Sequence, residues 1–167
     1  QFDHLSADGE TFTIGNITAK AIHSPGHTPA DMVYEIGGVL FTGDTLFAPD
    51  MGTARCDFPG GSAESMFNSV RNLLETYPAD TKIYLCHDYP EGKDRELAYT
   101  TSIGEQRTEN IHVNDSISME EFISLRQKRD ATLDLPTYIF PAVQINGNAG
   151  TLTPGEFIKL SYNKKVL

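Results

Sequence analysis

Hydrophobic and polar positions alternate over the first 42 residues in the way expected of paired β-strands. An Asp-Gly turn signal at residues 8–9 precedes a short alternating run, 11–14, and a longer run follows over residues 17–23. The apolar runs 32–36 and 39–42 are separated only by two glycines, which favours a tight hairpin. Because a hairpin reverses the chain once, the segment before its first strand and the segment after its second should lie side by side.

The middle of the chain switches to helical spacing between two strand-like runs. Residues 62–77 carry apolar side chains at helical intervals: Met66, Val70, Leu73, Leu74 and Tyr77. Ser62 or Ser65 can cap the start of this helix, and Pro78 ends it. Residues 82–86 form the next short strand. The order from residue 39 to residue 86 is therefore strand, helix, strand.

Two further helices and an irregular tail are expected after that strand. The first helix spans residues 94–110 and is broken or bent near Gly104. The second opens with a capping box over residues 118–121 and runs to about residue 130. The tail is expected to be irregular around its two prolines, Pro136 and Pro141. Strands and helices mix along the chain, in keeping with an α+β fold.

Candidate metal ligands recur where the predicted strands end. His27 lies on a Pro-Gly corner, in the segment His-Ser-Pro-Gly-His-Thr. Asp44 lies on a glycine corner, in Thr-Gly-Asp-Thr, and His87 follows in Leu-Cys-His-Asp-Tyr. Imidazole and carboxylate groups are the ligands that a hard or borderline metal ion takes. A single such residue is a weak signal, but three of them at strand exits predict a metal site.

These segments resemble the metallo-β-lactamase superfamily, whose H-x-P-G-H-T and T-G-D-T/A-L-F motifs hold a metal-binding histidine and aspartate. Residues 52–61, Gly-Thr-Ala-Arg-Cys-Asp-Phe-Pro-Gly-Gly, are similar to the G-x-x-R-x-D-F segment of the persulfide dioxygenases, which include bacterial β-lactamase hydrolase-like proteins. Residues 86–89 and the pattern from Thr101 through Glu105-Gln106-Arg107 to Asn110 match the same group. The resemblance covers residues 8–150 and implies an αββα sandwich.

One motif of the superfamily, H-x-H-x-D-H, does not occur in this sequence. It belongs well upstream of His27, and only 26 residues precede that histidine. We therefore expect residues 1–167 to be the carboxy-terminal part of one metallo-β-lactamase-like domain, supplying mainly the carboxy-terminal half of the sandwich, with residues 151–167 as a terminal extension. Such a chain should leave a sheet face or edge open. It should also be inactive alone, because a metal site depends on its ligand count.

The resemblance implies an iron(II) site with a glutathione-type thiol or persulfide as substrate. His27 and Asp44 match two of three iron ligands. His87 matches the histidine that binds a second metal in the binuclear hydrolases of the superfamily, and it is here either a ligand or a hydrogen-bonding neighbour. Zinc or nickel can replace iron at such a site.

Three residues are candidates for substrate binding. Arg55 can hold a carboxylate of glutathione through two parallel hydrogen bonds, or it can pair with Asp57 on the surface. Tyr89 matches a tyrosine near the glutathione, or it is a half-buried core residue. Phe58 can pack beside the metal and exclude water.

The implied activity is that of a sulfur dioxygenase, which oxidises glutathione persulfide with dioxygen to sulfite and releases glutathione. One alternative is a glyoxalase II-like binuclear zinc thioester hydrolase, which needs His87 as a ligand and Asp44 as a bridge. The other is a non-catalytic fragment that folds through a partner chain.

Composition narrows the possible partners. Thirteen basic residues against 23 acidic ones give a net charge of −10, which argues against nucleic-acid binding, and no apolar run approaches the ~20 residues that cross a bilayer. Cys56 and Cys86 form no disulfide framework, which fits a reduced cytoplasm. Each is either a small buried side chain or a neighbour of a sulfur substrate. We expect a homodimer, a structural role for His23, and solvated side chains at His4 and His112.

Overall fold

The computed structural model describes residues 2–148 and 150, which form parts of two compact units. One unit spans residues 6–131, and the other contains the two ends of the chain. The extension expected over residues 151–167 lies outside the described residues. No helix within the described part of the chain is long and apolar enough to cross a bilayer.

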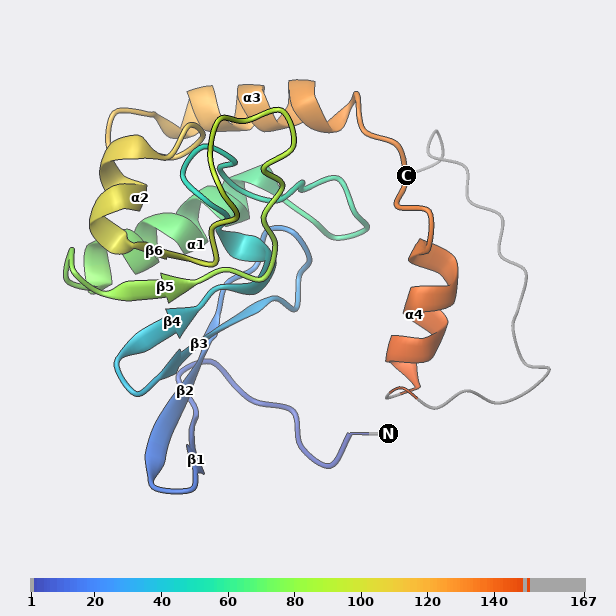
Figure 1. The fold of residues 1–167 in the computed structure, drawn as a ribbon. Coiled ribbons are helices and arrows are strands. Elements are labelled where there is room, and N and C mark those ends of the chain that lie inside the picture. Colours follow the sequence, from blue (N-terminus) through green and yellow to red (C-terminus); the bar gives the residue numbers. More distant parts are fainter. Residues whose placement is uncertain (1, 149, 151–167) are drawn as a thin grey trace. The chain divides into compact units, whose positions relative to one another are not determined.

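The unit of residues 6–131 contains a six-stranded sheet whose strands follow chain order (Figure 1). The strands are β1 (Thr11–Ile14), β2 (Ile17–His23), β3 (Met32–Ile36), β4 (Val39–Phe41), β5 (Lys82–Tyr84) and β6 (Thr100–Ser102). Neighbouring strands are antiparallel except β4 and β5, which are parallel. Consequently β2, β4 and β5 run in the same direction and end at the same edge of the sheet.

Helix α1 (Ala63–Thr76) lies between β4 and β5 in the chain, which confirms the predicted strand–helix–strand order, and it makes the crossover between these parallel strands. The Ser62 side chain caps it by accepting a hydrogen bond from the Ser65 amide. Its buried face joins one core with residues from one face of the sheet: Ile22, Val33, Leu40 and Ile83. Helix α3 (Met119–Asp130) lies on the same side of the sheet and packs on α1, with the rings of Phe67 and Phe122 5.6 Å apart (Figure 1).

The prediction of a helix over residues 94–110 is wrong for its first half. Residues 100–102 are β6, and only Ile103–Glu109 is helical, as α2. The Ser102 side chain accepts from the Glu105 amide while the Glu105 carboxylate accepts from the Ser102 amide, so a capping box starts the helix at Ile103. Pairing with β5 keeps the residues before it extended.

The prediction of an irregular tail is also wrong in part, because residues 139–147 form α4 (Ile139–Gly147). Pro141 is the third residue of this helix. An amide in the first turn has no helical partner, so a proline there breaks no hydrogen bond.

The other face of the sheet carries exposed apolar side chains. Its members include Phe12, Ile14, Ile17 and Phe41, which are 38–51% exposed. Phe12 contacts Tyr34 across the strands at 6.2 Å between ring centroids, and Phe41 stacks on Tyr84 at 5.1 Å. Residues 6–131 thus form two layers of an α+β fold: the sheet, and helices α1 and α3 on one of its faces.

Candidate metal centre

Three loops at one edge of the sheet carry the predicted metal ligands. His27 follows β2, Asp44 lies in a single 3₁₀ turn, η1 (Gly43–Thr45), after β4, and His87 follows β5. One Asp44 oxygen lies 3.9 Å from Nε2 of His27, and the other lies 3.4 Å from Nε2 of His87. The structure brings these three side chains together because the strands that precede them share a direction.

The donor set suits a divalent metal ion. Two ligands that each lie about 2.0–2.2 Å from one ion are separated by roughly 3–4 Å, which is the range of the two separations around Asp44. Two imidazoles and a carboxylate would leave positions open for other ligands, as non-haem iron(II) sites do. Each histidine is therefore placed to share a metal ion with Asp44. In the part of the chain that the structure describes, the set of donors that all lie within 4.8 Å of one another is Asp44, Cys86 and His87, and it does not include His27.

Cys86 is a fourth neighbour that sequence reasoning did not assign to the metal. Its sulfur lies 3.6 Å from an Asp44 oxygen, and donor atoms of Asp44, Cys86 and His87 all lie within 4.8 Å of one another. Partial burial and the Asp44 carboxylate raise the pKa of this thiol to about 12. Cys56, by contrast, is buried, and that burial raises its pKa to about 12, so the small-buried interpretation holds for Cys56 alone.

A hydrogen bond at Nδ1 fixes the orientation of the His27 ring. Nδ1 lies 2.7 Å from the backbone carbonyl of Arg55. A carbonyl only accepts, so Nδ1 is the donor in this contact, and Nε2 is the nitrogen directed toward Asp44. The corner that carries His27 is closed by the Asp31 carboxylate, which accepts from the amide and the hydroxyl of Thr28. His23 has the structural role expected for it, with its ring 2.9 Å from the Pro29 carbonyl.

The Arg55 segment packs directly against His27. The Arg55 guanidinium binds the Asp57 carboxylate with two hydrogen bonds of 2.6 and 2.8 Å, so the pairing alternative describes this structure. The pair does not lie on the surface, since the Arg55 side chain is only 12% exposed. The Phe58 ring meets the His27 ring edge-on at 5.0 Å.

Helix α3 contacts the Arg55 segment through two of its side chains. Arg126 donates to the carbonyl of Thr53 at 3.0 Å, and Asp130 accepts from the amide of Cys56 at 2.8 Å. Arg126 and Asp130 also form a buried ion pair with each other. Sequence reasoning missed both residues, because no local pattern links a helix to a loop more than 70 positions away.

His112 is buried, so its expected solvated position is wrong. It is 6% exposed, and its Nδ1 accepts from the amide of Thr53 at 3.0 Å. Burial, and then the charge of Arg126, lower the pKa of His112 to about 4. His112 is therefore neutral at physiological pH, which leaves Nδ1 able to accept.

Tyr89 lies beside His87 in a cluster of three rings. It is 49% exposed and is not part of the buried core, so of the half-buried core alternative only the half-burial holds. Its ring stacks on that of His87 at 5.9 Å, and the ring of Phe47 meets His87 at 6.0 Å and Tyr89 at 6.4 Å. Helix α2 fixes the backbone at Phe47, because the Gln106 side chain donates to the Phe47 carbonyl at 2.8 Å.

Comparisons with known proteins agree with this arrangement. The chain is 48% identical to Glyoxylase B2 of Dictyostelium discoideum over 98% of this chain and 56% of that protein. It is 33% identical to persulfide dioxygenase ETHE1 of Homo sapiens over 92% of this chain and 57% of that protein. The crystal structure of ETHE1 from Myxococcus xanthus superposes with a TM-score of 0.76 at 33% identity, over 87% of this chain and 60% of that one.

The chain spans a little over half the length of these relatives. Its residues 2–87 match the metallo-beta-lactamase superfamily. That match contains His27, Asp44 and His87. Because the motifs, the sheet that carries them and the superposition all agree, this chain belongs to the metallo-beta-lactamase superfamily.

Proposed function

We propose that this protein is an iron(II)-dependent persulfide dioxygenase that oxidises glutathione persulfide to sulfite. The observation that carries the proposal is the contact between the dioxygenase-like segment and His27. Arg55 supplies the carbonyl that fixes the His27 ring, and Phe58 packs on that ring. The similarity to proteins named persulfide dioxygenase supports the same activity.

The reaction balances with dioxygen as the oxidant. Glutathione persulfide, dioxygen and water give glutathione and sulfite with two protons. The outer sulfur is oxidised, the sulfur–sulfur bond breaks, and dioxygen is reduced. Bound iron(II) supplies the chemistry with dioxygen, which no side chain provides.

The residues of this chain would hold the metal and the substrate. His27 and Asp44 would be metal ligands, with His87 either a further ligand or a partner of Asp44. Phe58 would exclude water beside His27. Arg55 would bind a glutathione carboxylate in competition with Asp57. Tyr89, which is half exposed and stacked on His87, would contact the thiol substrate.

The test is oxygen uptake by the iron-loaded full-length protein. With glutathione persulfide, we expect one dioxygen consumed and one sulfite formed for each persulfide. Iron-loaded protein that consumes no oxygen, together with zinc-loaded protein that hydrolyses a glutathione thioester, would contradict the proposal.

One geometric feature favours a binuclear hydrolase as the second candidate. The two oxygens of Asp44 face different histidines, His27 and His87, as a carboxylate that bridges two metals would. The similarity to a protein named glyoxylase supports the same alternative. Two zinc ions per chain, located by anomalous scattering on either side of Asp44, would favour it over the oxygenase.

The remaining expectations are also proposals. We propose that the protein is a cytoplasmic homodimer, which sedimentation velocity and cell fractionation test. The third alternative, a non-catalytic fragment that folds through a partner chain, predicts that residues 1–167 bind no metal and do not unfold cooperatively alone.

A further inference from the structure

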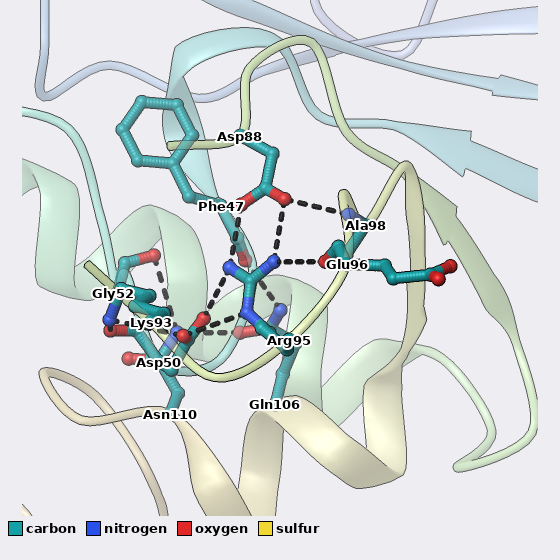
Figure 2. Close-up of polar contacts among 10 residues, drawn as sticks. All are labelled: Phe47, Asp50, Gly52, Asp88, Lys93, Arg95, Glu96, Ala98, Gln106 and Asn110. Carbon is teal, nitrogen blue, oxygen red and sulfur yellow. Dashed lines mark hydrogen bonds and ion pairs between the residues drawn. The ribbon is translucent and has the colours of Figure 1, made fainter. Parts of the chain in front are cut away.

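The guanidinium of Arg95 joins the loop that contains His87 to a neighbouring loop. The first loop follows Asp44 and contains Phe47 and Asp50. The second follows β5 and contains His87, Asp88 and Tyr89. Figure 2 shows the side chain of Arg95 between Asp50 and Asp88, with its donors directed at both carboxylates.

The bridge uses every nitrogen of the guanidinium. Nε and one terminal nitrogen of Arg95 donate to the two oxygens of Asp50 at 2.9 and 2.8 Å. The two terminal nitrogens donate to the two oxygens of Asp88, each at 2.7 Å. This geometry requires the planar fork of arginine, which a lysine ammonium cannot reproduce.

Both ends of the bridge are held by other groups as well. The Asp88 side chain is 2% exposed and also accepts from the amide of Ala98 at 2.7 Å. Lys93 adds an ion pair to Asp50 at 3.0 Å.

The bridged loops carry the three rings of the candidate site. Asp88 lies between His87 and Tyr89 in the sequence, and Asp50 lies three residues after Phe47. The ring of Phe47 contacts those of His87 and Tyr89 across the gap between the loops. Since ring contacts of this kind are weaker than a set of four charge-assisted hydrogen bonds, the bridge decides how the loops meet.

We propose that Arg95 is a positioning residue that sets where the rings of His87 and Tyr89 stand relative to Asp44. Arg95 acts through Asp88 and Asp50, the two carboxylates that it binds. The inference rests on the proposed metal centre. It holds for an oxygenase and for a hydrolase, because both place chemistry beside His87.

The test compares Arg95→Ala with Arg71→Ala in the full-length protein. Arg71 is a matched control, because it is also partly buried and binds Asp115 and the carbonyl of Asn114 instead. The ring carbon–proton NMR signal of His87, assigned by its loss in His87→Gln, reports the position of the imidazole. Thermal unfolding is measured for both variants.

Arg95→Ala should shift and broaden the His87 signal, and Arg71→Ala should leave it in place at a similar loss of thermal stability. Arg95→Lys should restore the signal only in part. Zinc affinity, measured by competition with a chelator, should fall by about tenfold in Arg95→Ala, as for other residues that orient metal ligands.

An unchanged His87 signal in Arg95→Ala would overturn the proposal. If that variant does not fold, Asp50→Asn removes one end of the bridge and leaves Asp88 paired, and it must then shift the same signal. These readouts need no turnover. An inactive wild-type protein would therefore count against the proposed function and not against the role of Arg95.

Discussion

His27 presents Nε2 to Asp44 because the carbonyl of Arg55 holds its other nitrogen. At the scale of single residues, the geometry of the site thus depends on specific contacts between atoms, and the types of the side chains alone do not set it. Asp44 is the common neighbour, with one oxygen toward each histidine. Removing that carboxylate should affect metal binding more than folding.

Asp44→Asn should therefore weaken zinc or iron binding by more than about tenfold while changing the unfolding temperature little. Equilibrium dialysis against a chelator measures the affinity. Asp115→Asn, which alters a surface carboxylate bound to Arg71 and Arg107, is the control and should bind metal as the wild type does. Equal affinities for the two variants would exclude Asp44 as a ligand.

The corner before His27 has no room for a side chain at Gly26. A Cβ there would lie 2.5 Å from Cα of Met66 in α1. Gly26→Ala should cost about 1–3 kcal/mol of unfolding free energy, as other overpacked sites do. In Gly147→Ala a Cβ would meet nothing within 4 Å, so urea unfolding should show no loss for that variant.

His112 should make stability depend on pH. Its pKa is about 4 in the folded protein against an ordinary 6.5, so the unfolded chain binds the proton more readily. Stability is then full above pH 6.5 and falls by about 2–3 kcal/mol as the pH drops toward 4. Urea titrations across this range should show the slope in the wild type and a flatter one in His112→Gln. Identical slopes would contradict a buried neutral His112.

At the scale of secondary structure elements, α3 acts as a support for the Arg55 segment. Its last turns reach that segment through Arg126 and Asp130, and the segment in turn fixes His27. A helix remote in sequence thereby influences the position of a candidate metal ligand. Arg95 likewise joins the loops that follow β4 and β5, through its hydrogen bonds to Asp50 and Asp88.

Asp130→Asn should destabilise the protein by about 3–5 kcal/mol, because it leaves the buried Arg126 charge without its counterion. Chemical denaturation measures this loss. Arg107→Ala removes a half-exposed ion pair with Asp115 and should cost less than about 1 kcal/mol. Similar losses for the two variants would show that the α3 pair contributes no more than a surface pair.

At the scale of the whole molecule, the sheet of the unit of residues 6–131 has one face packed on α1 and another with exposed aromatic and aliphatic side chains. Contiguous apolar surface of this kind favours association. Among the described residues, β1 is in addition an edge strand of the sheet, and edge strands are open to pairing with another chain.

Residues 1–167 should therefore bind a hydrophobic dye in the native state, and Phe41→Ser should reduce the fluorescence. Phe41 is 40% exposed on this face, so the substitution should cost little stability. Leu97→Ser changes a single side chain that is 62% exposed on a loop and should leave dye binding unchanged. Dye binding that is equal in all three proteins would mean that the face is covered.

Local signals in the sequence determined much of the fold. The Gly-Gly hairpin, the longer strands, the apolar stripe of α1 and the capping box of α3 all agree with the structure, because turn chemistry, side-chain period and caps act within a few residues. Short local motifs also identified His27, Asp44 and His87 as possible metal ligands.

Only the tertiary structure decided the rest. β6 is a strand because β5 pairs with it, His112 is buried because a loop 59 residues away lies over it, and Arg95 meets Asp50 across 45 residues. Contacts at such separations leave no periodic or motif signal in one sequence. What the sequence determined was therefore which groups stand at the strand ends, and what folding decided was which distant residues hold those groups in place.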